Sequence, residues 1–168
     1  MNRRTILSLC AVATLGLALL PGSAFAQSAK DLVGTWKMVT NINTAPDGRK
    51  SESFGPTPNS ILTFDANGRF VFVGTRPDLP KFASNNRMQG TAEENKAIVQ
   101  GSIAYFGTYS VVDKVLIQKV EGATWASWIG TDQKRPIISF MGDDMKVANP
   151  ATTLGGTSEA TYKRIHDK

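Results

Sequence analysis

The segment that decides the fold is LVGTWKMV, residues Leu32–Val39, where a glycine and a tryptophan stand two positions apart in a strand-like sequence. Successive side chains on a β-strand point to opposite faces, so Gly34, Trp36 and Met38 share one face and Lys37 lies on the other. Because Lys37 should face solvent, Trp36 and Met38 are expected to point inward. Gly34 would let the chain cross closely beneath the end of a barrel, which Trp36 would then fill.

The last strand-like segment of the chain offers a partner for Trp36. Ala160, Tyr162 and Arg164 share one face of that strand. From there the Arg164 guanidinium can lie over the indole ring, an interaction of about 0.5–2 kcal/mol. We therefore predict that Gly34, Trp36 and Arg164 form the structural closure of a barrel.

The first 26 residues have the composition of a secretory signal peptide. Arg3-Arg4 precedes an apolar run over Ile6–Leu20, and Ala24-Phe25-Ala26 matches an A-x-A cleavage pattern. The run is shorter than the roughly 20 apolar residues of a membrane-spanning helix. We predict a signal peptide over 1–26, a mature domain over 27–168, a periplasmic or secreted location and no stable membrane anchor. The two arginines fit both a Sec and a twin-arginine signal, which leaves the export route open.

The composition of the mature chain excludes several kinds of function. Of 168 residues, cleavage would leave 142, enough for one domain with a real core. It would remove the only cysteine, so we expect no disulfide, thiol nucleophile or thiolate metal site. Without Arg3-Arg4, 17 basic and 14 acidic residues remain, a net charge of +3. No basic run of the kind that binds nucleic acid occurs, and no nucleic-acid partner is expected.

Short β-type segments separated by turn sequences fill the rest of the chain. Asp65-Ala66-Asn67-Gly68 predicts a hairpin loop, and Thr91 with Glu94 forms a capping box for a helix that ends near Gln100. We predict an all-β fold with one short inserted helix: an antiparallel up-and-down β-barrel of about eight to ten strands, with a sandwich as the alternative. The expected strands are 34–42, 51–54 (ambiguous), 59–64, 69–74, 103–112, 115–121, 124–129, 136–141, 145–148 and 160–165.

Four segments together resemble the bacterial lipocalin-like domain proteins of the lipocalin superfamily. They are LVGTWKMV, GTAEENKAIVQGSIAYFGTYSV (Gly90–Val111), WIGTDQKRP (Trp128–Pro136) and EATYKRI (Glu159–Ile165). The resemblance covers essentially the whole mature chain. It implies a small calycin-type β-barrel, closed at one end, whose interior can hold one small apolar ligand. Unlike in ordinary lipocalins, the helix interrupts the strands instead of following them.

The inward-facing residues decide whether such a barrel is filled or hollow. Ile138 and Phe140 are expected to share a face, as are Tyr105, Gly107 and Tyr109. Small residues at Gly107, Ala126, Ser127 and Ser139 interleave with the aromatic ones and would leave room for a small hydrophobic ligand. Arg135 would anchor an acidic head group near the mouth. The predicted ligand-binding residues are Phe72, Tyr105, Tyr109, Trp125, Trp128, Arg135 and Phe140.

Catalysis is the first alternative to binding. The only histidine, His166, lies in the polar tail, and no second one exists for a zinc site. Asp143-Asp144 fits a hairpin turn, so we expect neither a metal nor another cofactor. Acid–base chemistry would still be open to Tyr105 or Tyr109 beside Arg135, as in a cyclase or isomerase acting on a hydrophobic substrate.

A surface that binds another envelope protein is the second alternative. The polar segment 76–87 is long for a loop and contains Pro77, Pro80 and Phe82, so it could act as a lid or a contact. The sequence leaves the ligand and the oligomeric state open.

Overall fold

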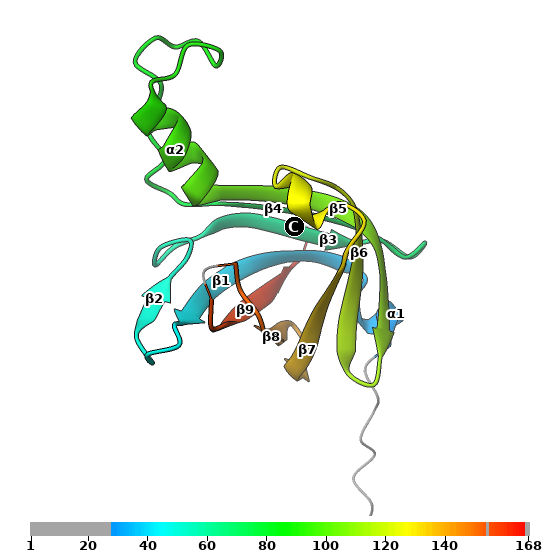
Figure 1. The fold of residues 1–168 in the computed structure, drawn as a ribbon. Helices are drawn as coiled ribbons and strands as arrows, with labels where there is room; N and C mark the ends of the chain where they lie inside the picture. Colours follow the sequence, from blue (N-terminus) through cyan, green and yellow to red (C-terminus); the bar gives the residue numbers. More distant parts are fainter. Residues whose placement is uncertain (1–27, 154, 167–168) are drawn as a thin grey trace, which may run out of the picture.

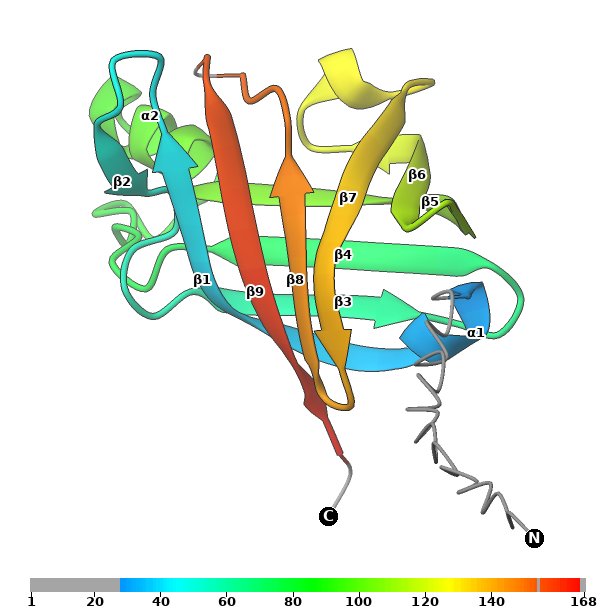
Figure 2. The same cartoon turned by 90° about the horizontal axis from the view of Figure 1, so that it is seen from below.

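The structure is a computed structural model that describes residues 28–153 and 155–166, so the predicted signal peptide lies outside the described residues. In the described part, nine antiparallel strands form one sheet (Figures 1 and 2). The strands are β1 (Gly34–Thr44), β2 (Lys50–Glu52), β3 (Asn59–Phe64), β4 (Arg69–Thr75), β5 (Ser102–Val112), β6 (Val115–Ala123), β7 (Asp132–Met141), β8 (Asp144–Asn149) and β9 (Thr157–Ile165).

The sheet closes into a barrel because β1 pairs on both sides. The first residues of β1 pair with β3, and the strand pairs along its length with β9, from Thr35 opposite Ile165 to Thr44 opposite Thr157. Eight strands thus form the closed ring, and the short β2 pairs only with the last residues of β1. The predicted up-and-down barrel is confirmed, and the sandwich alternative is wrong because the ring of hydrogen bonds is continuous.

Within residues 28–153 and 155–166, three short helices accompany the strands: α1 (Ala29–Leu32), α2 (Ala92–Gly101) and the 3-10 helix η1 (Ala126–Trp128). The predicted capping box of α2 is present, with the Glu94 amide donating to Thr91 Oγ1 and the Thr91 amide donating to Glu94 Oε2. In Figure 1, α2 projects away from the barrel at the end that holds β2, while α1 lies at the opposite end. We call these the open end and the closed end.

The prediction of a strand over 124–129 is wrong. β6 ends at Ala123, and the chain then turns through η1, where the amides of Trp128 and Ile129 donate to the carbonyls of Trp125 and Ala126. Gly130, with φ near 80°, completes the turn. The aromatic and β-branched residues in this segment thus form a tight connection across the open end.

Strand β7 also differs from its prediction. It begins at Asp132 and not at Pro136, which pairs with Val115 inside the strand. A bulge between Ile137 and Ser139 changes the alternation, so Ile137 is buried whereas Ile138 is 49% exposed. Ile138 therefore does not share the inward face with Phe140. Ser139 is exposed, so its small side chain does not enlarge the interior of the barrel.

Gly107 was expected to leave room for a ligand, but the structure shows a different reason for a glycine at this position. A Cβ atom there would approach the Lys119 carbonyl oxygen to 1.9 Å, at the bulge where β5 pairs with β6. The glycine is needed for close approach of two backbones and not to enlarge the interior.

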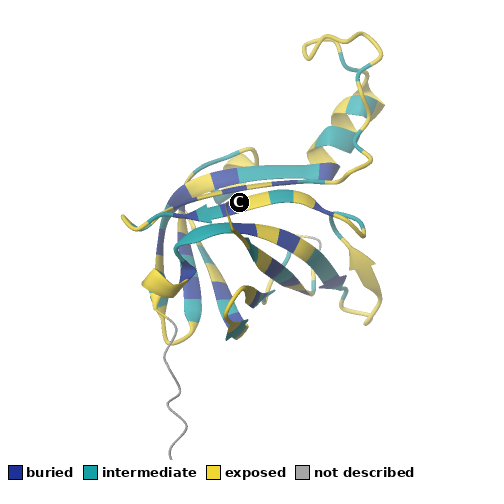
Figure 3. Cartoon of the chain, turned by 180° about the vertical axis from the view of Figure 1, so that it is seen from behind, coloured by how far each residue is buried: buried dark blue, intermediate teal, exposed yellow. Residues whose placement is uncertain are grey.

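Burial alternates along the strands, as one buried face predicts (Figure 3). The closed end is filled by Leu32 and Trp36, both 0% exposed, and the Trp36 Nε1–H donates to the Leu32 carbonyl at 2.9 Å. Arg164 places its guanidinium carbon 4.1 Å from the centroid of the Trp36 ring. The structure thus brings Gly34, Trp36 and Arg164 together beneath the barrel.

Candidate functional site

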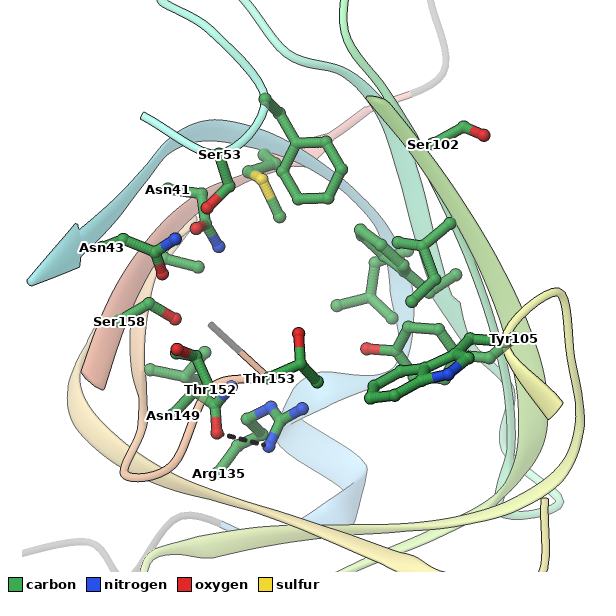
Figure 4. Close-up of a pocket in the computed structure, with 18 of the residues that line it drawn as sticks. Asn41, Asn43, Ser53, Ser102, Tyr105, Arg135, Asn149, Thr152, Thr153 and Ser158 are labelled. Carbon is green, nitrogen blue, oxygen red and sulfur yellow. Dashed lines mark hydrogen bonds between the residues drawn. The ribbon is translucent and has the colours of Figure 1, made fainter. Parts of the chain in front are cut away.

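The open half of the barrel contains a cavity of about 790 Å³ (Figure 4). Strands from all around the ring line its deeper part with apolar side chains. At the mouth, residues of β2, the end of α2, η1 and the β8–β9 connection contribute polar groups. A volume of this size lies within the range of about 300–1,000 Å³ of small-molecule pockets. The apolar residues of the deeper wall are Met38, Leu62, Phe72, Tyr105, Leu116, Met145, Val147, Ala160 and Tyr162.

A row of aromatic rings leads from the interior to the mouth. Tyr105 lies 5.2 Å from Phe72 and 5.0 Å from Trp128, measured between ring centroids, and the second pair is nearly perpendicular at 84°. Trp125 follows at 5.4 Å from Trp128 and is the most exposed of the four. Edge-to-face contacts of this kind stabilise aromatic groups beyond their burial, and the row offers flat apolar surface to a ligand.

Arg135 lies on β7, in the wall of the cavity. Only 9% of this residue is exposed. Its Nη1 donates to Asn149 Oδ1 at 3.1 Å and to the Lys134 carbonyl, and its Nη2 donates to Gln133 Oε1 at 3.2 Å. The guanidinium also lies 5.9 Å from the centroid of the Trp128 ring. These contacts hold a positive charge against the aromatic row.

Further polar side chains are buried around the same cavity. Asn43, Gln118 and Ser158 all line it, and Gln118 is only 3% exposed. Burial raises the pKa of Tyr105, although the positive charge of Arg135 acts in the opposite direction, and burial also raises the pKa of Tyr162. Both hydroxyls therefore stay protonated at neutral pH and can donate a hydrogen bond.

Five of the seven predicted ligand-binding residues line this cavity: Phe72, Tyr105, Trp125, Trp128 and Arg135. The other two lie at the closed end. The Tyr109 hydroxyl donates to the carbonyls of Ala29 and Asp65, and Phe140 packs against Trp36 with 5.8 Å between centroids. Tyr109 and Phe140 point inward, as the alternation of side chains predicts, but they lie near the closed end and not along the cavity.

The sequence reasoning missed the buried polar residues of the cavity. Gln118 stands between Leu116 and Val120 on one face of β6, and all three are buried. A polar residue in an otherwise apolar, inward-facing series was the available signal. Asn43 and Ser158 lie opposite each other in the β1–β9 pair. Their place in the cavity could be predicted only if the pairing that closes the barrel was known.

The elements of the catalytic alternative are only partly brought together. Tyr105 lies close enough to Arg135 for the positive charge to act on the pKa of its hydroxyl, whereas Tyr109 is bonded to Asp65 at the closed end. His166 lies at the closed end with its Nε2 2.8 Å from Asp143 Oδ2. Within residues 28–153 and 155–166 no group of three or more histidine, cysteine and acidic residues is placed to hold a metal ion. None of the helices in that part of the chain has the length and apolar character to span a membrane.

Comparison with known proteins agrees with the geometry. The profile of the lipocalin-like domain family matches residues 33–163, and the chain therefore belongs to this family. A curated relative is the 4'-hydroxy-3'-methoxypropiophenone carrier protein ppsC of Aspergillus oryzae (strain ATCC 42149 / RIB 40). It is 28% identical over 81 residues, which cover 44% of this chain and 72% of the relative.

Two solved structures are similar in fold. A lipocalin-like protein from Bacteroides uniformis ATCC 8492 is 12% identical, with a TM-score of 0.46. An uncharacterized protein from Bacteroides eggerthii DSM 20697 is 11% identical, with a TM-score of 0.42. In both cases the alignment covers 80% of this chain and 99% of the other.

Proposed function

We propose that this protein binds a small, mainly apolar molecule inside the open half of its barrel. The observation that carries the proposal is the cavity of about 790 Å³, whose walls combine an aromatic row with a few buried polar groups. Apolar walls supply most of the binding free energy, and a small number of polar groups orient the ligand. The relative described as a carrier of an aromatic ketone supports a binding role for this chain.

The cavity contains its own fluorescent reporters, which allows a direct test. Trp125 and Trp128 line the cavity, whereas Trp36 is fully buried at the closed end. A bound apolar molecule should therefore quench tryptophan emission saturably. Most of this quenching should disappear when Trp125 and Trp128 are both replaced by phenylalanine but persist in Trp36→Phe. Absence of saturable quenching across a panel of apolar ligands, with native circular dichroism, would refute the proposal.

A variant that fills the cavity provides a second test. Ala160 and Ser158 lie on β9 and face the interior. Ala160→Leu should reduce the affinity for the same ligands on the order of tenfold, because the added side chain occupies ligand volume. The matched control is Lys163→Leu on the exposed face of β9, which should leave the affinity unchanged.

We also propose that the protein acts after export to the periplasm or the medium. Support comes from the signal-type sequence over residues 1–26. Amino-terminal sequencing of the protein from cell fractions checks this: a mature chain that begins at Gln27 outside the cytoplasm is expected, and an uncleaved cytoplasmic chain would contradict it.

A further inference from the structure

Arg135 differs from four other arginines of the described chain in the partners that surround it. Arg49, Arg69, Arg76 and Arg164 each form an ion pair with an aspartate or glutamate. Arg135 is the only buried charged residue in the described part of the chain, and its hydrogen bonds there go to neutral oxygens of Gln133, Lys134 and Asn149. A buried cation without a counter-charge is unfavourable unless something compensates it.

The Arg135 guanidinium also has N–H groups that these hydrogen bonds do not use. An arginine has five N–H groups, and three hydrogen bonds are formed, two from Nη1 and one from Nη2. None of these three hydrogen bonds uses Nε, and the Tyr105 hydroxyl beside the guanidinium is a further neutral partner. A carboxylate or sulfonate can accept two hydrogen bonds from an arginine side by side, which is the strongest arrangement of this type.

The surroundings of Arg135 provide neutral donors but no anion. The cavity has two other charged residues in the described chain, both at its mouth: Glu52, which is exposed, and Arg76, which is paired with Asp78. The Gln118 side chain, 3% exposed, lines the same cavity. Figure 4 shows Tyr105 and Arg135 facing this common space. A polar group bound here would meet an arginine, a protonated phenol and an amide.

From this geometry we infer that the ligand is an amphipathic anion, whose carboxylate or similar group pairs with Arg135 and whose apolar body lies along the aromatic row. This inference rests on the proposed binding function and narrows its ligand class. It also gives the ligand an orientation, with the anionic group at Arg135 beside Tyr105 and Gln118 and not free in solvent.

Two dyes with the same N-phenylnaphthylamine skeleton test the inference. 8-Anilinonaphthalene-1-sulfonate carries a sulfonate, and N-phenyl-1-naphthylamine does not. Fluorescence titration of the purified protein should show saturable binding of both. Arg135→Gln should weaken the anionic dye on the order of tenfold and the neutral dye less than about twofold, because only the sulfonate loses a charge-assisted bond. Arg135→Lys, which keeps the charge without the planar fork, should give an intermediate loss.

Arg76→Gln is the matched control, since it removes one positive charge from the mouth of the same cavity. It should change neither dye's affinity more than about twofold, because Arg76 is half exposed and already paired. Equal weakening of both dyes by Arg135→Gln, or equal weakening of the anionic dye by Arg76→Gln, would overturn the inference while leaving the binding function intact. No saturable binding of either dye would instead refute the proposed function.

The wild-type protein gives a test that depends on no variant. Decanoate should compete with the bound sulfonate dye at a concentration at least about tenfold lower than decanol, which has the same chain without the charge. Competition by decanol at the same concentration as decanoate would contradict a dedicated anion site.

Discussion

The two ends of the barrel each hold an arginine beside a tryptophan, and the two pairs differ in how the arginine is satisfied. At the closed end, Arg164 lies 4.1 Å from the Trp36 ring centroid, donates to the carbonyls of Val33 and Asp31 and pairs with Asp143. At the open end, Arg135 lies 5.9 Å from Trp128 and has only neutral acceptors.

The difference shows how one pair of residue types can stabilise a fold in one place and form a candidate site in another. Trp36 is 0% exposed and its indole N–H donates to the Leu32 carbonyl, so the closed end has no free volume beside its tryptophan. Trp128 is half-buried beside a cavity. Arg164 has a carboxylate partner in Asp143 and is structural, whereas Arg135 has only neutral acceptors and can pair with an external anion.

The largest expected effect is the loss of stability when the closed-end tryptophan is truncated. Trp36→Ala should lower the free energy of unfolding by about 3–5 kcal/mol, because it removes a fully buried aromatic side chain and leaves a void. Trp128→Ala, the matched change at the open end, should cost only about 1–2 kcal/mol. Urea denaturation of the two variants measures both values, and a larger loss for Trp128→Ala would invalidate the contrast between the ends.

A second expected effect concerns the glycines that shape the two ends. Gly34 has φ of 131°, and a Cβ there would lie 2.8 Å from Arg164 Nη1. Gly34→Ala should therefore cost about 1–3 kcal/mol through backbone strain and displacement of the arginine. Gly130 at the open end has φ of 80° with nothing near its Cβ position, so Gly130→Ala should cost only about 1 kcal/mol. Thermal melts of both variants test this order.

The sequence predicted the β3–β4 hairpin better than the segment that follows β6, for a physical reason. Alternation along 59–64 and 69–74 corresponds to β3 and β4 almost residue for residue, because those strands are regular and join through a short turn. The segment 124–129 contains the same β-forming residue types, yet it forms η1, and its Trp128 packs edge-on against Tyr105 of β5.

The candidate site was predictable only where a residue type itself carries the signal. Aromatic residues on inward faces were recognised, but alternation gives the face and not the depth, which is why Tyr109 and Phe140 were placed in the cavity. No residue pattern in the sequence indicates the bulge after Ile137, and because of this bulge Ile138 faces outward and not inward as predicted. Gln118 became meaningful only when the register placed it inside the barrel.

A smaller effect on stability should come from the contact between Trp36 and Arg164 at the closed end. In a double-mutant cycle, Trp36→Ala and Arg164→Ala should show a coupling of about 0.5–2 kcal/mol, since their shared contact can be lost only once. The same cycle on Trp128 and Arg135 should give a smaller coupling because those groups are farther apart. Additive losses at Trp36 and Arg164 would mean that the contact contributes nothing to stability.

The smallest expected effect is a pH dependence that separates the two ends. At the closed end, hydrogen bonds from the backbone and side chain of Ser28 hold the pKa of Asp31 below its ordinary value, with a further contribution from Arg164. At the open end, the side chain of Arg49 lowers the pKa of Asp47. A carboxyl group whose pKa falls on folding stabilises the native state above its unfolded pKa of about 4, and this contribution is lost as the pH falls below that value.

The stability difference between wild type and Asp31→Asn should therefore shrink as the pH falls from 6 to 3, and the same should hold for Asp47→Asn. Salt distinguishes the two. The Asp47 effect depends chiefly on an exposed charge pair and should nearly vanish at 1 M NaCl, whereas the Asp31 effect depends chiefly on Ser28 and should largely remain. Urea denaturation at each pH and salt concentration measures both, and an Asp31 effect that vanishes in salt would mean that its charge interaction with Arg164 outweighs the cap.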